Sequence, residues 1–237
     1  MLSIFRLLTN ISVVALFALL SGCDREDPGP LQKIHKEFVI TDFDRLEMGS
    51  EFHIRVEQAN SFSVRVQGDR RNVDDLEVYV QGNTLVIEFE DQRDRHHDTN
   101  IDITMPVLKA VNFSGASDSR VRGFSSGDDI DLYLSGASIC QVDAEFSRIN
   151  LFMSGGSEIL LFGAGDELKG EISGASSLKA FDYPVRSATI EISGASESRV
   201  TVTEELNVTA GGASSVVYRG EPSVNADTSG AASVKKD

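Results

Sequence analysis

A four-residue motif, Ser-Gly-Ala-Ser or a close variant, recurs seven times from residue 114 onward. Aligned on the second residue, successive copies are 21, 19, 19, 20, 18 and 18 residues apart, and that residue is always glycine: Gly115, Gly136, Gly155, Gly174, Gly194, Gly212 and Gly230. Repetition at a nearly constant period is typical of a solenoid, in which each repeat forms one coil that stacks on the next. No other feature limits the possible folds of the chain as strongly.

The residues that precede each glycine alternate between apolar and polar. Eighteen of the 21 residues found six, four and two positions before the seven glycines are apolar, whereas only three of the fourteen interleaved residues are: Ala110, Tyr133 and Phe152. Because a flexible linker would show no such order, the alternation predicts a strand with one buried face. A second apolar row, six residues after the glycine, predicts a second strand in each repeat: Val121, Val142, Leu161, Ala180, Val200 and Tyr218.

A repeat of this size cannot bury its own apolar face, so consecutive copies must pair in parallel, about 4.8 Å apart. The sequence therefore predicts an all-β protein, a parallel β-helix or solenoid of roughly 20-residue coils, right-handed by the crossover rule for parallel strands. Each motif would form a corner in which glycine adopts a backbone conformation closed to other residues. In that corner Ser173, Ala175 and Ser176 are expected to keep the coil narrow, with inward serines hydrogen-bonded from coil to coil.

The chain divides into four segments. Residues 1–22 are expected to be a lipoprotein signal peptide, 23–36 a tether, 37–105 an N-terminal β-rich cap or early coils, and 106–237 the β-helix of Ser-Gly-Ala-Ser repeats. A repeat array needs a cap because an uncovered end exposes its core and its strand edges. Within the third segment, apolar residues mirror one another across Gln81–Thr84 and predict a hairpin. The mirrored residues are Leu76, Val78 and Val80 with Leu85, Ile87 and Phe89.

The N-terminus contains the cationic residue Arg6, then an apolar run over residues 11–20, and then Leu20-Ser21-Gly22-Cys23. This order is typical of a secretory signal peptide, and its end looks like a bacterial lipobox. We therefore expect cleavage before Cys23 and a membrane anchor of lipid, including palmitate, on that cysteine. A transmembrane anchor is the alternative, but about ten apolar residues are too few for a span. Cys140 would then lack a disulfide partner and is expected to be a small buried residue.

The formal charge of −15 at pH 7 is spread along the chain and predicts an acidic surface. Nucleic acid is not an expected partner, because phosphate binding needs clusters of Lys and Arg. No metal or other cofactor is predicted either. His96 and His97 stand beside Asp98, but adjacent residues on a strand point to opposite faces. We interpret the segment that contains them, Asp91–Asn100, as a polar hairpin loop.

Three segments and the recurring Ser-Gly-Ala-Ser coils carry a family likeness from about Phe38 to the end of the chain: FVITDFDRLEMGSEFHIRV, LEVYVQGNTLVIEF and ITMPVLKAVNFSGASDSRV. Together they resemble the bacterial family described as putative auto-transporter adhesin, head GIN domain. The resemblance implies a β-helical envelope lipoprotein or secreted protein of Bacteroidota-like bacteria. Its expected place is the outer membrane or the cell surface, or the periplasmic side. The resemblance implies no catalytic residues.

Tyr133 and Phe152 occupy the same outward position in successive coils and should lie side by side, with Asp131 and Asn150 one outward position earlier. Aromatic faces beside carboxylate and amide groups suit the recognition of a sugar or a protein. The simpler interpretation is that these rings only stabilise neighbouring strands. The function predicted from the sequence is adhesin-like binding of a glycan or protein by a non-catalytic envelope lipoprotein.

Two other functions stay open at this point. Many parallel β-helices cleave acidic polysaccharides, and such chemistry needs carboxylates at a fixed separation. Carboxylates do gather in two places, in turns and on outward strand positions: Asp128, Asp129 and Asp131, and Asp166, Glu167 and Glu171. The other function is a structural scaffold, in which copies of the chain would self-associate through the terminal coil around Val234.

Overall fold

The computed structural model describes residues 29–91, 93–125 and 128–237. The predicted signal peptide, the predicted lipidation site Cys23 and part of the predicted tether therefore lie outside the described residues. All the elements below belong to one compact unit, Leu31–Asp237, which contains the whole described hydrophobic core. Within the described part of the chain, no helix is long and apolar enough to span a membrane.

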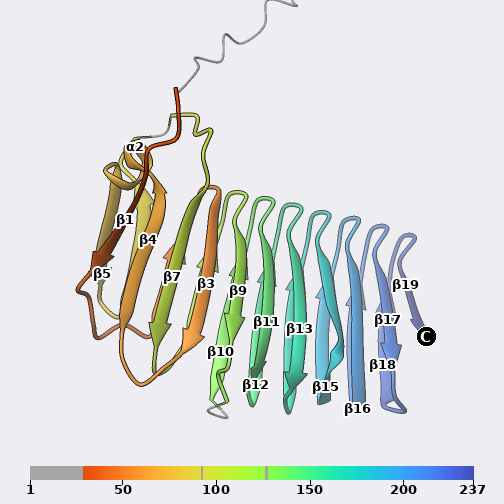
Figure 1. The fold of residues 1–237 in the computed structure, drawn as a ribbon. Coiled ribbons are helices and arrows are strands. Elements are labelled where there is room, and N and C mark those ends of the chain that lie inside the picture. Colours follow the sequence, from red (N-terminus) through yellow and green to blue (C-terminus); the bar gives the residue numbers. More distant parts are fainter. Residues whose placement is uncertain (1–28, 92, 126–127) are drawn as a thin grey trace, which may run out of the picture. The chain divides into compact units, whose positions relative to one another are not determined.

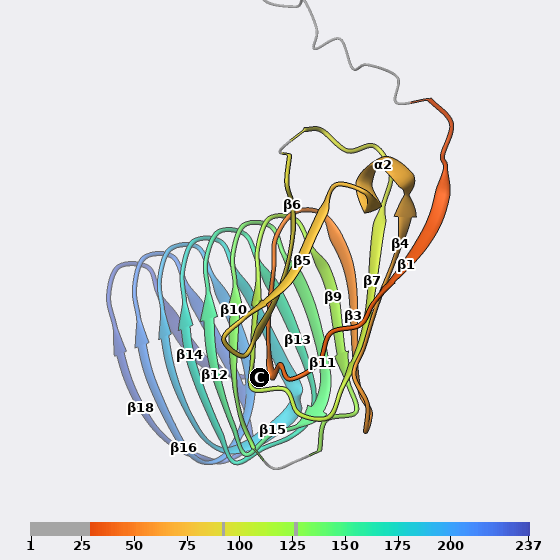
Figure 2. The ribbon, with the colours of Figure 1, turned by 90° about the vertical axis from the view of Figure 1, so that its left-hand side faces the viewer.

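The repeats form a parallel β-solenoid with two strands in each coil (Figure 1, Figure 2). The strands that lead into the Ser-Gly-Ala-Ser corners form one ladder, called here the back ladder: β8 (Ala110–Phe113), β10 (Asp129–Leu134), β12 (Arg148–Met153), β14 (Glu167–Ile172), the second halves of β15 (Ser177–Ile192) and β16 (Glu197–Ala210), and β18 (Ser223–Thr228). The strands that leave the corners form the front ladder: β9 (Asp118–Arg122), β11 (Ile139–Glu145), β13 (Glu158–Ala164), the first halves of β15 and β16, β17 (Ser215–Arg219) and β19 (Ser233–Lys236). Every pairing within both ladders is parallel, which confirms the predicted parallel solenoid.

The chain before β8 extends both ladders. β2 (Arg45–Met48) and β3 (Phe52–Gln58) form a coil that lies between the coil of β8 and β9 and an outer coil of β6 (Thr84–Phe89) and β7 (Thr99–Met105). In sequence order, the chain therefore forms the inner coil of β2 and β3 first, then the outer coil of β6 and β7 on one side of it, and then the coil of β8 and β9 on the other side. The coil that comes first in the sequence is thus not the terminal one in space.

Antiparallel strands lie beyond the outer coil, around the short helix α2 (Arg70–Val73). They are β1 (Lys33–Phe38), β4 (Ser63–Asp69) and β5 (Leu76–Gln81), of which β4 pairs with β7 and β5 pairs with β6. The predicted hairpin is confirmed, because Leu76 lies opposite Phe89 and Val80 opposite Leu85.

The inward side chains of the two ladders fill the interior. The apolar rows predicted from the sequence are buried from β8 to β16, where Leu132, Leu151 and Ile190 have no exposed surface. Lys109 is an exception: it is exposed, and its Nζ lies 3.1 Å from Asp44 Oδ2. In the coil of β18 and β19, Val224 is 39% exposed, because no later strand of the described chain covers it.

The corners are narrow because each corner glycine stacks on the one before it. The seven glycines have φ between 71° and 78°, a region that residues with a side chain rarely adopt. A Cβ added to Gly174 would lie 2.3 Å from the carbonyl oxygen of Gly155. The amide N–H of Ala175 donates to that same oxygen at 2.7 Å. The hydrogen-bond ladder therefore continues around the corner, and it leaves no room for a side chain.

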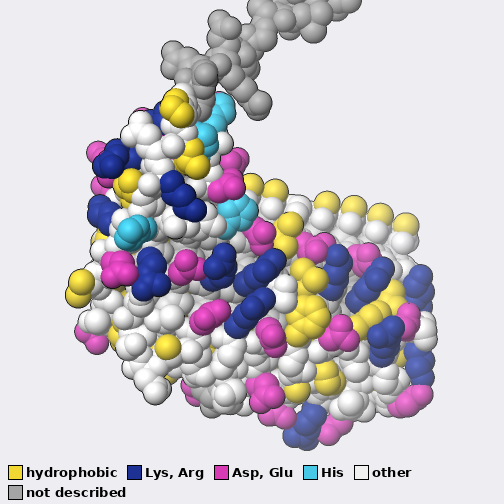
Figure 3. Space-filling model, viewed as in Figure 1, with side chains coloured by type: hydrophobic (Ala, Val, Ile, Leu, Met, Phe, Trp, Pro, Cys, Tyr) yellow, Lys and Arg dark blue, Asp and Glu magenta, His cyan; other side chains and the backbone are white. Residues whose placement is uncertain are grey.

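Only the fourth residue of the motif points into the coil, which corrects the expectation for the first and the third; Ser173 is half-buried. Ser176 is buried, whereas Ala175 is exposed. The same holds for the equivalents of Ala175, which form an exposed ridge of small residues along the upper edge in Figure 3: Ala116, Ala137, Gly156, Ala195, Ala213 and Ala231. The third residue therefore plays no part in narrowing the interior.

The inward serines close their own corners, and some also bond from coil to coil, so the predicted ladder is confirmed in part. The backbone N–H of Ser176 donates to the hydroxyl of Ser196 at 3.3 Å, and the hydroxyl of Ser138 donates to the carbonyl of Phe113 at 3.4 Å. The hydroxyl of Ser176 donates to the carbonyl of Ser173 at 2.8 Å. The same bond recurs in other corners: Ser138 to Ser135, Ser157 to Ser154 and Ser214 to Gly211. Among the described inward corner serines, only Ser157 and Ser176 bring their hydroxyls together, at 3.3 Å.

Cys140 and the segment Asp91–Asn100 bear on two further predictions. Cys140 is fully buried, as predicted, and burial raises the pKa of its thiol to about 12.

The segment Asp91–Asn100 is not a hairpin loop, because β6 belongs to the back ladder and β7 to the front ladder. Residues 93–98 of this segment lie on the path from one ladder to the other. Arg95 holds this crossing in place with its guanidinium 3.5 Å from the ring centroid of Phe89.

Candidate functional site

A groove of about 670 Å³ runs along the outward side of the back ladder, beside the corners. The groove crosses several coils. In each of them it is lined by the outward residue that stands three positions before the corner glycine. Parallel pairing places these residues about 4.8 Å apart from coil to coil. They belong to one continuous row of paired residues, called here the back row: Glu47, Asn112, Tyr133, Phe152, Glu171, Glu191, Thr209 and Asp227.

The aromatic pair predicted from the sequence lies in this groove. Tyr133 and Phe152 are direct partners on β10 and β12. Their ring centroids are 4.7 Å apart and their planes differ by 6°, so the rings are stacked. Tyr133 is 39% exposed. The two rings therefore form one continuous aromatic surface that a ligand in the groove can reach.

Asp131 and Asn150 border the aromatic pair but do not line the groove. They are direct partners on the same two strands, and the amide of Asn150 donates to the carboxylate of Asp131 at 2.8 Å. Each side chain is half-buried. Because the two groups bind each other, they support the strand pair beneath the rings more directly than they offer free contacts.

The groove is acidic beyond the aromatic pair. Glu171, Glu191 and Asp227 line it, and the groove-lining residues of the described chain include no Lys or Arg. None of the three carboxylates has an ion-pair partner among the described residues, and neither has Glu47. Glu191 and Asp227 were not among the residues singled out from the sequence. Their position in the repeat could have indicated them, because both stand three residues before a corner glycine, as Tyr133 and Phe152 do.

Of the carboxylates considered for catalysis, Asp129 and Glu167 take part in a chain of ion pairs outside the groove, whereas Glu171 lines the groove. Arg148 bonds Asp129 at 2.9 Å and Glu167 at 2.6 Å, and Lys169 lies 3.0 Å from Glu167. The hydrogen bond from Arg148 lowers the pKa of Glu167. Asp128 is exposed just before β10. The structure therefore does not bring Asp128, Asp129 and Asp131 together around a common point.

No metal centre is evident in the described part of the chain, which contains no group of three or more His, Cys, Asp or Glu placed to hold an ion. His96 and His97 lie in the crossing between β6 and β7, and the backbone carbonyl of His97 accepts a hydrogen bond from Asn72. Asp98 faces a different histidine, His53, at 3.8 Å.

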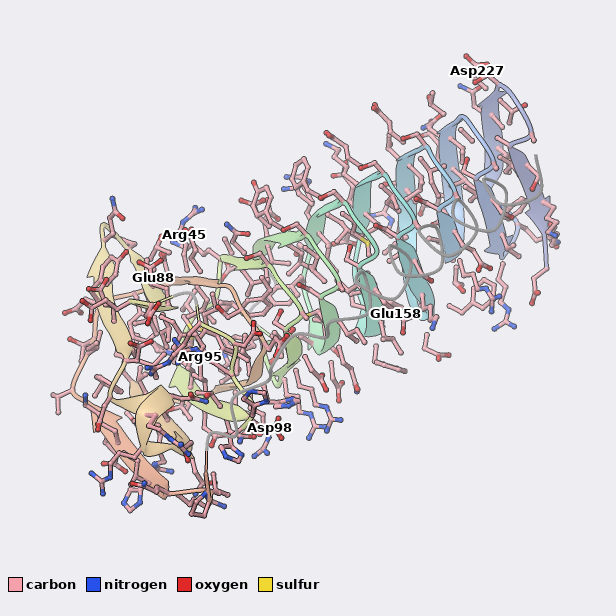
Figure 4. The ribbon with its side chains drawn as sticks, turned by 90° about the horizontal axis from the view of Figure 1, so that it is seen from above. Arg45, Glu88, Arg95, Asp98, Glu158 and Asp227 are labelled. Atoms are coloured by element: carbon pink, nitrogen blue, oxygen red, sulfur yellow. The ribbon has the colours of Figure 1, made fainter. Side chains whose placement is uncertain are left out.

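The outward side of the front ladder carries a second continuous row, five positions after the corner residue. This row is called here the front row: Arg55, Arg120, Gln141, Leu160, Lys179, Arg199, Val217 and Lys235. From Arg55 to Lys235 it contains five cations and no carboxylate, and in the outer coil it continues with Asp102, the partner of Arg55 on β7. Lys and Arg side chains are prominent on this face in Figure 3. Seen from above in Figure 4, the back face with Asp227 and the front face with Glu158 point in opposite directions.

Solved structures share this fold over nearly their whole length. A putative adhesin from Bacteroides fragilis superposes with a TM-score of 0.77 at 18% identity, over 87% of this chain and 97% of the other. A putative adhesin from Parabacteroides distasonis gives 0.72 at 19% identity, over 88% and 98%. A putative lipid binding protein from the same species gives 0.71 at 20% identity, over 86% and 96%. At such identities the likeness shows the fold alone.

Comparison with the curated proteins finds no match. A family model does match, over residues 42–222. The matched region is more than half of the chain, and it runs from the inner coil of β2 and β3 to β17. It includes most of the back row and of the front row. The chain belongs to the family described as putative auto-transporter adhesin, head GIN domain.

Proposed function

We propose that this protein is a non-catalytic, adhesin-like component of the cell envelope that binds a glycan or a protein in the groove of the back face. The observation that carries the proposal is the stacked pair of Tyr133 and Phe152, an aromatic surface open to the groove. Membership of a family described as an adhesin domain supports a surface or envelope role.

The chemistry of the groove suits such a ligand. A sugar ring, or an apolar or cationic side chain, can pack on the two stacked rings. Ser135, Ser154 and Ser173 also line the groove, and their hydroxyls can donate or accept hydrogen bonds. Both rings sit on paired strands, so little conformational freedom is lost when a ligand binds.

We also propose that lipid on Cys23 holds the protein on a membrane, at the outer membrane or cell surface, or on its periplasmic side. The support is the signal-like sequence that ends in Leu20-Ser21-Gly22-Cys23. An alkyne analogue of palmitate fed to expressing cells should label the protein. Label that persists in a Cys23→Ser variant would contradict this anchor.

The binding proposal is tested on an array of glycans and matrix proteins, with the unit Leu31–Asp237 as the probe. The expected result is saturable binding to at least one ligand class. Replacing both Tyr133 and Phe152 by Ala should weaken that binding by at least about tenfold, because a buried aromatic anchor often contributes 2 kcal/mol or more to affinity. Melting curves of each variant check that the fold is retained.

Tyr79→Ala is the matched control. Tyr79 is also 39% exposed, but it lies on β5, away from the groove. Its replacement should leave binding unchanged. Absence of binding across the whole array would refute the proposal. Release of sugar products from an acidic polysaccharide, lost in an Asp129→Asn variant, would instead support the carbohydrate-active alternative.

A further inference from the structure

The two outward rows carry opposite charges in a pattern that does not favour folding. On the back row, Glu171 and Glu191 are direct neighbours, and on the front row Lys179 and Arg199 are direct neighbours. Like charges placed opposite each other on paired strands destabilise a sheet. Stability of the single chain therefore does not explain the pattern, whereas a contact with a complementary surface does.

The complementary surface is present on the chain itself. From the coil of β2 and β3 onward, each coil contributes one residue to each row, eight positions apart in the sequence, so these parts of the rows have the same length and spacing. In the outer coil the rows continue with Val86 and Asp102. Paired coil by coil, every carboxylate of the back row meets a cation: Glu47 with Arg55, Glu171 with Lys179, Glu191 with Arg199, and Asp227 with Lys235. In the middle of the rows, Phe152 meets Leu160, and Tyr133 meets Gln141.

We propose that the groove takes a second copy of this chain, which docks its front row against the back row of the first. The two copies lie side by side, parallel and at the same height. The inference rests on the proposed function, because it names a partner for the groove described there. The long side chains of the front row, such as Lys179 and Arg199, can reach into the groove of the other copy.

The charges select one alignment of the two copies. With the copies parallel and level, all four carboxylates of the back row face cations. A shift by any number of coils leaves at most two such pairs. Turning one copy end for end leaves two when the copies are level and at most three at any other offset. For example, a reversed copy places Leu160 opposite Glu171 and Gln141 opposite Glu191. Parallel and level is also how copies held by their N-termini on one membrane would meet.

Contacts within the chain do not occupy the front row fully. Lys179 bonds Glu158 at 2.7 Å, and Arg199 bonds Glu197 at 2.7 Å, but all four side chains are substantially exposed. Exposed pairs of this kind add little stability. An ammonium group has three donors and a guanidinium has five, so each cation can bind a second carboxylate. For Arg120 no ion pair is found among the described residues.

The contact is heterologous, because it joins different faces of the two copies. Each dimer therefore leaves one free groove and one free front row, and further copies can add to form an open row. The net charge of −15 makes copies repel one another at long range. At an ionic strength of about 0.15 M this repulsion is screened beyond about 8 Å, while contacts inside the groove are screened less.

The test is a charge exchange, measured by analytical ultracentrifugation of Leu31–Asp237 at physiological ionic strength. The unchanged protein should associate as its concentration rises. A back-row variant, Glu171→Lys with Glu191→Lys, and a front-row variant, Lys179→Glu with Arg199→Glu, should each associate at least about tenfold more weakly, because like charges would then face each other. An equimolar mixture of the two variants should regain association, because each then offers the other a complementary row.

The control is Glu145→Lys with Asp182→Lys, which makes the same change in net charge as the back-row variant but at exposed positions outside both rows. It should associate as the unchanged protein does. A chain that stays monomeric up to millimolar concentration, or a mixture that fails to regain association, would overturn the inference. So would association that only Val234→Asp abolishes, because that result assigns it to the terminal coil. Ligand binding by a monomeric chain would keep the proposed function and reject this partner.

Discussion

At the scale of single residues, the corner glycines decide whether the coils can stack. Gly174 has φ of 78°, and an added Cβ would lie 2.3 Å from the carbonyl oxygen of Gly155. The constraint is therefore double, since both the backbone conformation and the space exclude a side chain. A corner glycine is required for folding, whatever ligand the protein binds.

Gly174→Ala should lower the free energy of unfolding by at least about 2 kcal/mol, because left-handed strain and a backbone clash add together. Gly174→Val should abolish folding. Gly156→Ala is the matched control: it adds the same methyl group to the exposed ridge, where the nearest atom is 4.0 Å away. Urea unfolding measures all three, and a normally stable Gly174→Val protein would disprove the assignment of the corner.

One residue shows why the sequence does not reveal every corner. Ser50 occupies the corner of the inner coil with φ of 70°, although it is not glycine, and the amide of Ala116 donates to its carbonyl. The seven corners from Gly115 onward could be predicted because each combines glycine with an alternating apolar strand. The corner at Ser50 lacks that signature. Its role depends on contacts with β8 and β9, which are remote in sequence.

At the scale of elements, Asp69 joins three segments at the N-terminal end of the solenoid. It is the last residue of β4 and the N-cap of α2, and its side chain is only 1% exposed. Its carboxylate accepts hydrogen bonds from the backbone of Gln32 and from both the backbone and the guanidinium of Arg71. The hydrogen bond from the Arg71 side chain is the main cause that holds the pKa of Asp69 well below its usual value.

Asp69→Asn should therefore destabilise the protein at neutral pH by roughly 1–3 kcal/mol, because it removes a charged acceptor with several donors. The lowered pKa means that the ionised carboxylate stabilises the fold above about pH 4 and that this contribution is lost as the pH falls further. The variant should show a correspondingly smaller loss of stability between pH 4 and pH 2. Denaturation measured across that range, with exposed Asp182→Asn as the control, tests both points.

Most elements follow from local pattern, and the exceptions have a common cause. The strands of the repeats and the hairpin of β5 and β6 could be predicted, because period-two alternation and turn residues act over short stretches. The crossing from β6 to β7 was wrongly predicted as a hairpin loop, because nothing near His96 indicates that the two strands belong to different ladders. In the candidate site, the stacking of Tyr133 and Phe152 could be predicted from their repeat position. The groove and its charge depend on all the coils together.

At the scale of the whole molecule, each coil contacts mainly the coils on either side. Stability of such an array is close to a sum of terms for coils and for the interfaces between them. Removal of one complete coil should therefore be tolerated, provided that the remaining rows stay in phase. The 18 residues Gly194–Gly211 make up such a coil, from one corner to the next.

Deletion of Gly194–Gly211 would stack Val216 on Leu178 and Val224 on Ala188, so apolar rows would still meet. We expect a folded protein with a β-rich circular dichroism spectrum and a melting temperature lowered by several degrees. Deletion of Gly194–Val202 is the control: it removes only the strand of the front ladder and should prevent folding. If both deletions fold equally well, the array does not depend on complete coils.

The inner coil of β2 and β3 has a consequence for the order in which the protein folds as it is synthesised. Both sides of this coil are covered only when β6, β7, β8 and β9 have all been made. The emerging chain must therefore wait until about Arg122 before its first closed layer is complete. From that point, each newly made coil can pair with the strand edges of the coil that folded before it. Folding thus begins with one slow, cooperative step and then proceeds coil by coil toward the C-terminus.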